Sequence, residues 1–132
     1  MNRQNFSSGS VWENIVGYSR AVRIGNTIEV SGTTAVNEFT EIVGENDVFA
    51  QTFYILQKID KILVEAGSGL FDVIRTRIFI TDMSEWENVA KAHVHFFKDI
   101  KPACSLVEVS KLIDERLLVE IEITAIVSEK GL

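Results

Sequence analysis

Two carboxylates lie two residues apart within residues 117–127, a segment of alternating apolar and polar side chains. Side chains of a β-strand point alternately to its two faces, so Glu120 and Glu122 are predicted to share one face. Neighbouring carboxylates can separate their pKa values and act as an acid and a base. Ion pairs with Arg75 or Arg77 at an interface would explain the same two carboxylates equally well.

Other side chains could also bind or react. Cys104 is either a nucleophile, which would need a nearby base or cation to lower its pKa, or a small apolar residue in a strand. His93 lies on the apolar stripe of a predicted helix. It is interpreted either as a packed, half-buried histidine or as an acid–base group. Arg20 is predicted to share a strand face with Tyr18. It is either a surface arginine or a cation that reaches into a ligand site. His95 lies off the helical stripe and is predicted to be exposed.

The composition argues against several classes of protein. The chain has 132 residues and a net charge of -6, and its thirteen Lys and Arg residues are scattered rather than gathered in the basic stripe of a nucleic-acid binder. Its eight glycines form no phosphate-binding loop, and two histidines with one cysteine cannot complete a typical zinc site without carboxylates. We therefore expect no metal and no organic cofactor.

The single cysteine allows no intrachain disulfide, and no apolar run has the length of a signal peptide or a membrane span. The expectation is a cytoplasmic protein with one domain, residues 1–132, and no membrane association.

Hydrophobic periodicity predicts an α+β fold with the element order ββαβαββ. The predicted strands cover residues 18–24, 27–33, 71–80, 103–109 and 117–127, and the predicted helices run from Asn46 or Asp47 to about Glu65 and from Ser84 to a point before Pro102. Gly25-Asn26 suits the tight turn of a hairpin, and Ser84-Glu85-Trp86-Glu87 matches a capping box. Ile74, Ile78 and Ile80 are predicted to share a face. Trp12 and Trp86 are interpreted as packing anchors.

Two amphipathic helices can cover only one face of such a sheet. The other face mixes the two carboxylates with Leu118 and Ile126. This mixture favours an interface between subunits, with water and a ligand between them, over a plain solvent face.

Several short motifs fall in register with one known family. Pro102-Ala103-Cys104-Ser105-Leu106-Val107-Glu108-Val109, followed by Val119-Glu120-Ile121-Glu122, resembles the C-terminal signature of the RidA or YjgF-like reactive-intermediate deaminases, usually R-P-A-R-x-x-V-x-V and then V-E-I-E. Gly17-Tyr18, Ile24-Gly25-Asn26 and Val30-Ser31-Gly32 resemble the N-terminal hairpin of the family. Ala66-Gly67, Asp72-Val73-Ile74 and Phe79-Ile80-Thr81-Asp82 resemble its central segment.

The resemblance implies a chorismate-mutase-like fold, a homotrimer with an inner β-barrel, and clefts between subunits. It implies hydrolysis of a 2-imino or enamine acid to a keto acid and ammonia without a cofactor. By position, Glu120 matches the glutamate that orients the water, and Tyr18 matches a tyrosine of the cleft. Ser31, Gly32 and Thr33 match the strand end that lines it, and helix positions such as His93 reach the cleft from the neighbouring subunit.

Cys104 stands where the family carries the arginine that grips the substrate carboxylate. A neutral thiol offers neither the charge nor the two parallel donors of a guanidinium, and the loss costs on the order of 2–5 kcal/mol in a desolvated cleft. The chain therefore resembles a divergent subgroup that lacks this arginine, and Arg20 is a candidate replacement.

Three functions follow from the resemblance. The first is a deaminase that hydrolyses a small enamine or imine, and a small carboxylate is a candidate ligand. The second is a trimer that binds a small metabolite without catalysis. The third and weakest is a ribonuclease-type activity, which the acidic charge disfavours.

Overall fold

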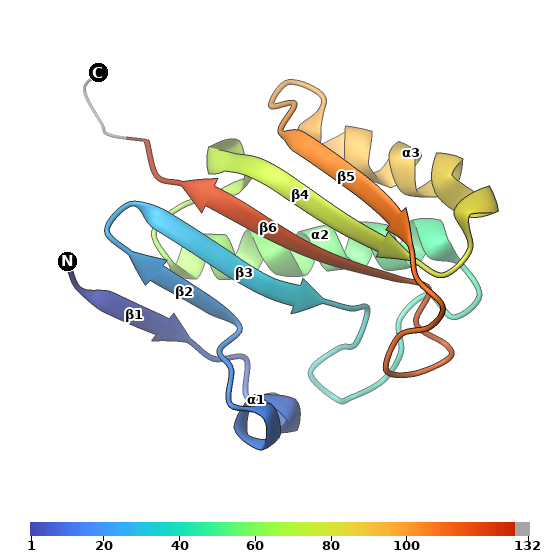
Figure 1. Ribbon diagram of the computed structural model, residues 1–132, viewed down its shortest axis with the longest axis horizontal. Helices are drawn as coiled ribbons and strands as arrows, with labels where there is room; N and C mark the ends of the chain where they lie inside the picture. The colour runs from blue at the N-terminus through green and yellow to red at the C-terminus, as the bar shows by residue number, and fades with distance from the viewer. Residues whose placement is uncertain (129–132) are drawn as a thin grey trace.

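The segment with the strongest alternation, β6 (Val119–Ile126), lies inside a six-stranded sheet in the computed structural model, which describes residues 1–128. The strand order is β1-β2-β3-β6-β4-β5, with β4 and β5 parallel and all other neighbours antiparallel (Figure 1). The other elements are β1 (Arg3–Phe6), α1 (Val11–Val16), β2 (Ala21–Ile24), β3 (Thr27–Thr33), α2 (Val48–Glu65), β4 (Val73–Ile80), α3 (Trp86–Phe97), β5 (Ala103–Glu108) and the 3-10 turns η1 (Leu70–Asp72) and η2 (Met83–Glu85).

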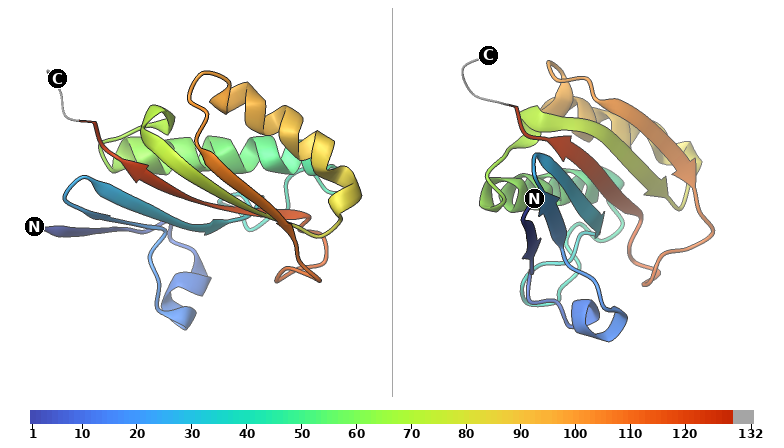
Figure 2. Two further views of the ribbon diagram at one scale, coloured as in Figure 1. Left: turned by 45° about the horizontal axis from the view of Figure 1, so that its top comes forward. Right: turned by 60° about the vertical axis from the view of Figure 1, so that its left-hand side comes forward.

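Helices α2 and α3 pack side by side on one face of the sheet and leave the other face open (Figure 2). Along β6, Val119, Ile121, Ile123 and Ala125 are fully buried against the helices. Each large aliphatic side chain buried in this way contributes roughly 1.5–3 kcal/mol relative to an exposed one. The α+β class and the placement of both long helices on one face are therefore confirmed.

The long helix α2 begins where the sequence predicted. The Asp47 side chain accepts a hydrogen bond from the Ala50 amide at 3.0 Å and caps the helix. Leu56, Ile59 and Leu63 of its apolar stripe are fully buried. Between β2 and β3, Gly25 has φ of 59°, the left-handed conformation that the hairpin turn requires.

The predicted capping box at Ser84 is wrong. Residues 83–85 form η2 instead, in which the Asp82 carboxylate accepts bonds from the Ser84 amide and hydroxyl, and α3 begins at Trp86 without a side-chain cap. The predicted face of β4 is also wrong at one position. A register shift between Val73 and Arg75 turns Ile74 outward, so that its side chain is 47% exposed.

The N-terminal region departs most from the sequence-based prediction. Residues 3–6 add the edge strand β1, and residues 11–16 form the short helix α1, neither of which periodicity indicated. Trp12 and Trp86 are about half exposed, so neither anchors the core of its own chain. No helix within residues 1–128 is both long and apolar enough to cross a bilayer.

Candidate functional site

A bulge in β3 shapes the candidate site. Val30 pairs with Ile123 of β6 and Thr33 pairs with Ile121, so two residues of β3, Ser31 and Gly32, stand opposite one residue of β6. Val30 and Thr33 are consequently both buried, although they are three positions apart. At the bulge, the alternation of β3 side chains between the two faces of the sheet therefore shifts by one residue.

Glu120 lies against the backbone of Gly32 at this bulge. A Cβ atom added to Gly32 would lie 2.9 Å from Glu120 Cδ, so only glycine admits the carboxylate at this position. Burial raises the pKa of Glu120 above its ordinary value of 4.5, the positive charge of Arg20 opposes this rise, and the negative charge of Glu122 adds to it. The half-buried carboxyl group can therefore take up and release a proton closer to neutral pH than an exposed glutamate can.

Arg20 forms the cationic side of the same cluster. Its Nη2 donates a hydrogen bond to Gly32 O at 2.6 Å, and its guanidinium carbon lies 5.6 Å from the centre of the Tyr18 ring. The Nε atom is buried, and no residue among 1–128 accepts a hydrogen bond from it. A buried donor without an acceptor is costly, and an anionic ligand would supply the acceptor.

Two hydroxyl residues support the bulge. Ser31 Oγ donates to Ser19 O at 2.7 Å, and the Ser31 amide donates to Arg20 O at 3.0 Å. Thr33 was expected to line the cleft, but its side chain is only 1% exposed and its hydroxyl donates to Ser31 O at 2.8 Å. Thr33 therefore stabilises the β-bulge, and its hydroxyl group is not presented at the surface of the chain.

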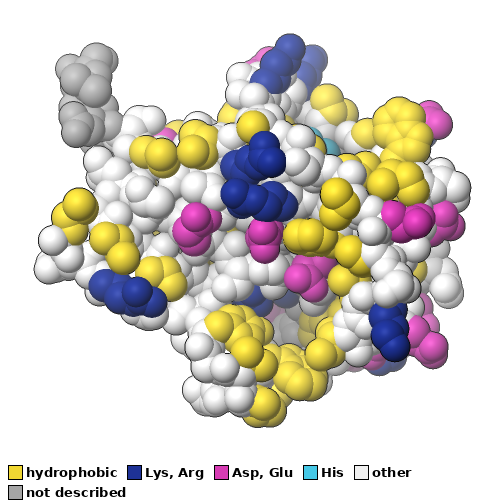
Figure 3. All heavy atoms as spheres, viewed as in Figure 1, with side chains coloured by type: hydrophobic (Ala, Val, Ile, Leu, Met, Phe, Trp, Pro, Cys, Tyr) yellow, Lys and Arg dark blue, Asp and Glu magenta, His cyan; other side chains and the backbone are white. Residues whose placement is uncertain are grey.

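A polar hollow of about 500 Å³ adjoins the cluster. Tyr18, Ser19 and Ser31 line it together with Glu13 and Asn14 of α1. The space-filling view shows the surface hollowed between α1 and the sheet (Figure 3). Small polar molecules can therefore approach Tyr18 and Ser31 from this side.

Lys58 is a charged neighbour that sequence reasoning missed. Its ammonium donates to Thr34 O at 2.9 Å and to Val36 O at 2.8 Å, and it holds the loop after β3 against α2. Burial, together with the charge of Arg20, lowers the pKa of Lys58 from 10.5 to about 8. Nothing in the spacing of helix α2 distinguishes this lysine, because its partners are backbone carbonyls of a distant loop.

Cys104 and His93 lie in a different place. Cys104 pairs in register with the buried Thr76 and is therefore on the helix side of β5, an outer strand of the sheet. Both residues line an apolar groove of about 410 Å³ between α3 and β5. His93 Nε2 lies 3.0 Å from Thr76 Oγ1, and burial lowers the pKa of His93, which favours the neutral ring. Within one chain, these two residues do not line the hollow beside Tyr18.

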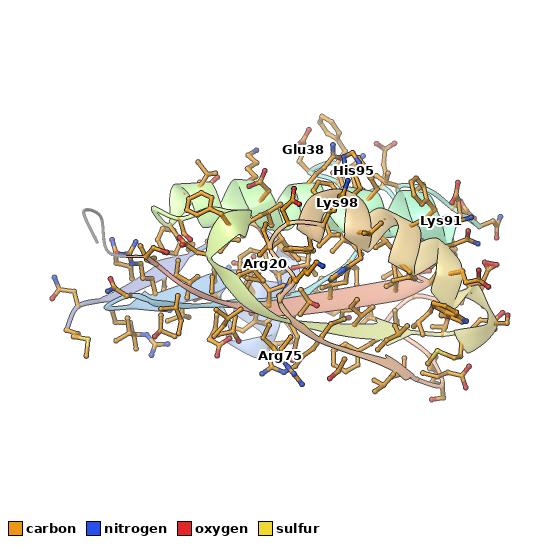
Figure 4. All side chains as sticks on the ribbon, turned by 90° about the horizontal axis from the view of Figure 1, so that it is seen from above. Arg20, Glu38, Arg75, Lys91, His95 and Lys98 are labelled. Carbon is orange, nitrogen blue, oxygen red and sulfur yellow. The ribbon has the colours of Figure 1, made fainter. Side chains whose placement is uncertain are left out.

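The other polar residues of the open face are paired. Arg77 Nε lies 3.8 Å from Glu122 Oε1, so the ion-pair interpretation of Glu122 is supported. Arg75 donates to Ser105 Oγ at 2.8 Å and points away from the helices, whereas the exposed His95 lies on the helix side (Figure 4). Among residues 1–128, no three His, Cys, Asp or Glu side chains gather as potential metal ligands.

A carboxyl group with a raised pKa and a half-buried arginine whose Nε is unpaired within residues 1–128, both at a bulged strand, are features of an acid–base site for a small polar or anionic ligand on an α+β scaffold. The family model described as Endoribonuclease L-PSP matches residues 10–127. The chain belongs to this family, which is the RidA/YjgF-like family.

Individual relatives agree with this assignment. An uncharacterised protein of Streptomyces coelicolor, SCO2049, is 36% identical over 118 residues, which cover 89% of this chain and 87% of that protein. The 3-aminoacrylate deaminase RutC of Acinetobacter baylyi is 32% identical over 104 residues, or 79% and 82% of the two chains. The crystal structure of Rv2704 from Mycobacterium tuberculosis, described as a member of the YjgF/YER057c/UK114 family, superposes with a TM-score of 0.87 at 47% identity and covers 96% of this chain and 100% of that one.

Proposed function

We propose that the protein hydrolyses a small enamine or imine to a carbonyl compound and ammonia, in a cleft between the subunits of a homotrimer. The observation that carries the proposal is the half-buried carboxyl group of Glu120, with its raised pKa, held against Gly32 and near Arg20. The similarity to a relative named as a 3-aminoacrylate deaminase supports the same reaction class.

The reaction needs one water and one group that moves a proton. An enamine first gains a proton from solvent on its carbon and becomes an iminium ion, the protonated form of the imine. The Glu120 carboxylate then takes a proton from water while the water oxygen attacks the C=N carbon. The protonated carboxyl group gives this proton to the nitrogen. The regenerated carboxylate then takes the proton of the hydroxyl group while the C–N bond breaks, so that the carbonyl forms and ammonia leaves. A pKa raised above 4.5 suits these proton transfers, because it makes the carboxylate a stronger base and keeps the acid form accessible.

Arg20 and its neighbours bind the substrate in this proposal. The Arg20 guanidinium carries a permanent charge, and its buried Nε–H has no acceptor within residues 1–128. A substrate carboxylate would accept the hydrogen bond that this Nε–H can donate. Arg20 would thereby take over the carboxylate contact that the family arginine makes from the position of Cys104. Tyr18 and Ser31 line the adjoining hollow. If Arg20→Ala binds a small carboxylate as tightly as the wild type, Arg20 is not part of the site.

A second function is favoured by the surroundings of Cys104. The groove around this thiol is mostly apolar and holds the neutral form of His93, and the cations that line it, Lys98 and Lys101, lack the two parallel donors of an arginine. A trimer that binds a small metabolite without turning it over fits this observation. Cleavage of RNA is less well supported, because the chain has a net charge of -6.

The deciding experiment measures ammonia release from freshly generated 2-iminobutanoate. The wild type is expected to exceed the buffer rate, and Glu120→Gln is expected to lose about 10²- to 10⁴-fold, the usual contribution of a positioned acid–base group. Glu122→Gln is the matched control, because Glu122 shares the strand face but is paired with Arg77. Ammonia release no faster than buffer at high protein concentration would reject the deaminase and leave the binding function. Equal losses in the two variants would reject the role of Glu120.

A further inference from the structure

Gln51 is a buried polar side chain of α2 whose hydrogen bonds all leave its own helix. It is 0% exposed, although glutamine is mostly exposed in folded proteins. Its Nε2 donates to Arg116 O at 2.9 Å and to Gly44 O at 3.2 Å, and its Oε1 accepts from the Leu118 amide at 2.9 Å. These bonds offset the cost of burying the amide. They also join α2 to two backbone segments, one that follows β3 and one that leads into β6.

Lys58 makes contacts of the same kind two helical turns further along α2. Seven residues separate it from Gln51, so the two side chains leave the helix on the same side. The Lys58 ammonium donates to Thr34 O and Val36 O, and Ala35 between them is fully buried. Helix α2 therefore holds the loop between β3 and α2 at its first residues through Lys58 and near its end through Gln51.

These anchors lie beside the two residues that form the contact at the bulge. Leu118, which Gln51 holds, is two residues before Glu120 in the chain. Thr34, which Lys58 holds, is two residues after Gly32. The Glu120 side chain lies against the Gly32 backbone. Each partner in this contact is therefore fixed to α2 at a distance of two residues.

Helix α2 lies on the opposite face of the sheet from the Glu120 side chain. It packs against β3 and β6 on the face that it shares with α3 (Figure 1), and Val119 and Ile121 are fully buried there. Glu120 stands between these two residues in the strand, so its side chain points to the other face. Because an α-helix has a fixed rise, Gln51 and Lys58 are held about 10 Å apart along the axis of α2. The helix thereby fixes the spacing of the two backbone segments that it holds.

We propose that Gln51 and Lys58 are positioning residues of the candidate site, which hold the Glu120 carboxyl group against Gly32 through the start of β6 and the end of β3. Gln51 sets the β6 side, which carries the carboxyl group. Lys58 sets the β3 side, which carries Gly32 O, the acceptor of the Arg20 hydrogen bond. The effect on ammonia release rests on the proposed function, whereas the effect on the position of the carboxyl group does not.

The primary readout is the pKa of Glu120, measured by carbon NMR on protein labelled at its glutamate carboxyl groups. The Glu120→Gln variant identifies the signal. Gln51→Met and Lys58→Met each remove the hydrogen bonds of one anchor and keep a long side chain. Circular dichroism checks that each variant is folded. Gln51→Asn, whose amide is one methylene shorter and remains uncharged, takes the place of Gln51→Met if that variant does not fold.

Two matched controls lie on the same helix. Thr52→Val removes a hydroxyl that is as deeply buried as Gln51 but donates to Val48 O inside α2, at 2.7 Å. Lys61→Met removes the same charge as Lys58→Met from an exposed position of α2. These controls separate the loss of an anchor from the loss of a buried polar group and from the loss of a charge.

Both anchor variants are expected to shift the pKa of Glu120, and both controls are expected to leave it at the wild-type value. For ammonia release, Gln51→Met should lower kcat by about 10²-fold, the order that a displacement of about 1 Å produces, with KM near the wild-type value. Lys58→Met should lower kcat and also raise KM, because it releases the end of β3 to which Arg20 is hydrogen-bonded. A purely structural role would not produce this division between the two constants.

An unchanged pKa of Glu120 in the folded Gln51 and Lys58 variants would overturn the proposal. An equal shift in Thr52→Val would also overturn it, because any loss of a polar group in the core of α2 would then have the same effect. If the pKa shifts but the wild type releases no ammonia, the positioning role stands and the proposed function fails. If the wild type releases ammonia and the pKa does not move, the proposed function stands and the positioning role fails.

Discussion

Replacing Gly32 by alanine is expected to displace the Glu120 carboxylate while leaving the fold intact. The φ angle of Gly32 lies outside the left-handed region, so the backbone accepts alanine without strain. The added Cβ would lie 2.9 Å from Glu120 Cδ and 3.3 Å from Glu120 Cγ. Glu120 Oε2 would lie closer still, and carbon atoms pack at about 3.5–4.0 Å, so the carboxylate must move by about 1 Å or more.

The expected cost is large for catalysis and small for stability. A displacement of about 1 Å in a catalytic group can lower the rate by about 10²-fold, so the specificity constant for ammonia release should fall by this order. The free energy of unfolding should change by less than about 1 kcal/mol, because the lower entropy of the unfolded alanine variant offsets part of the new contact.

A double-mutant cycle assigns the effect to Glu120. In the Glu120→Gln background, Gly32→Ala should cost much less than in the wild type, because the group that it displaces has already lost its function. A direct titration gives a second readout. The carboxylate moves away from the β3 backbone, so the burial that raises its pKa changes, and a shifted pKa of Glu120 is expected. Full activity with an unchanged pKa in Gly32→Ala would refute the reasoning, and so would equal losses in both backgrounds.

Two predictions concern stability and pH. Because the pKa of Glu120 is raised in the folded state, its ionisation destabilises the fold at neutral pH. Glu120→Gln should therefore have a larger free energy of unfolding than the wild type at neutral pH, and this difference should vanish below pH 4.5. Urea unfolding at several pH values measures the difference. Lys58 has a folded pKa of about 8 against 10.5 for the free group, so the wild-type free energy of unfolding should rise between these pH values as the buried ammonium loses its proton. Lys58→Met removes the titrating group and should lose this rise, and urea unfolding at several pH values measures it. A variant with the same pH slope as the wild type would contradict the assignment.

The sequence predicted the elements whose pattern is strictly periodic. Helix α2 with its Asp47 cap and strand β6 with its buried alternate residues are set by local repeats, which can be read without tertiary information. Strand β1 has four mostly polar residues at a sheet edge and no alternation to detect. Helix α1 carries its apolar residues outward, so a rule that assigns such residues to the core misplaces Trp12.

The candidate site was only partly accessible to sequence reasoning. Resemblance grouped Tyr18, Gly32 and Glu120, and the structure connects them through Arg20. His93 and Cys104 were placed in the same cleft, yet in one chain they line a separate groove. Their meeting with Tyr18 and Glu120 in a cleft between two copies stays a prediction.

The bulge in β3 ties the environment of Glu120 to the number of residues in the strand as well as to their types. Two residues of β3 stand opposite one residue of β6 between the pairs Val30–Ile123 and Thr33–Ile121. Deleting either extra residue would restore regular pairing and leave Thr33 inward opposite Ile121, but it would remove the bulge against which Glu120 lies. The surroundings of the carboxylate therefore depend on the length of this strand as well as on the glycine at position 32, and the loss of one codon would rearrange them at once.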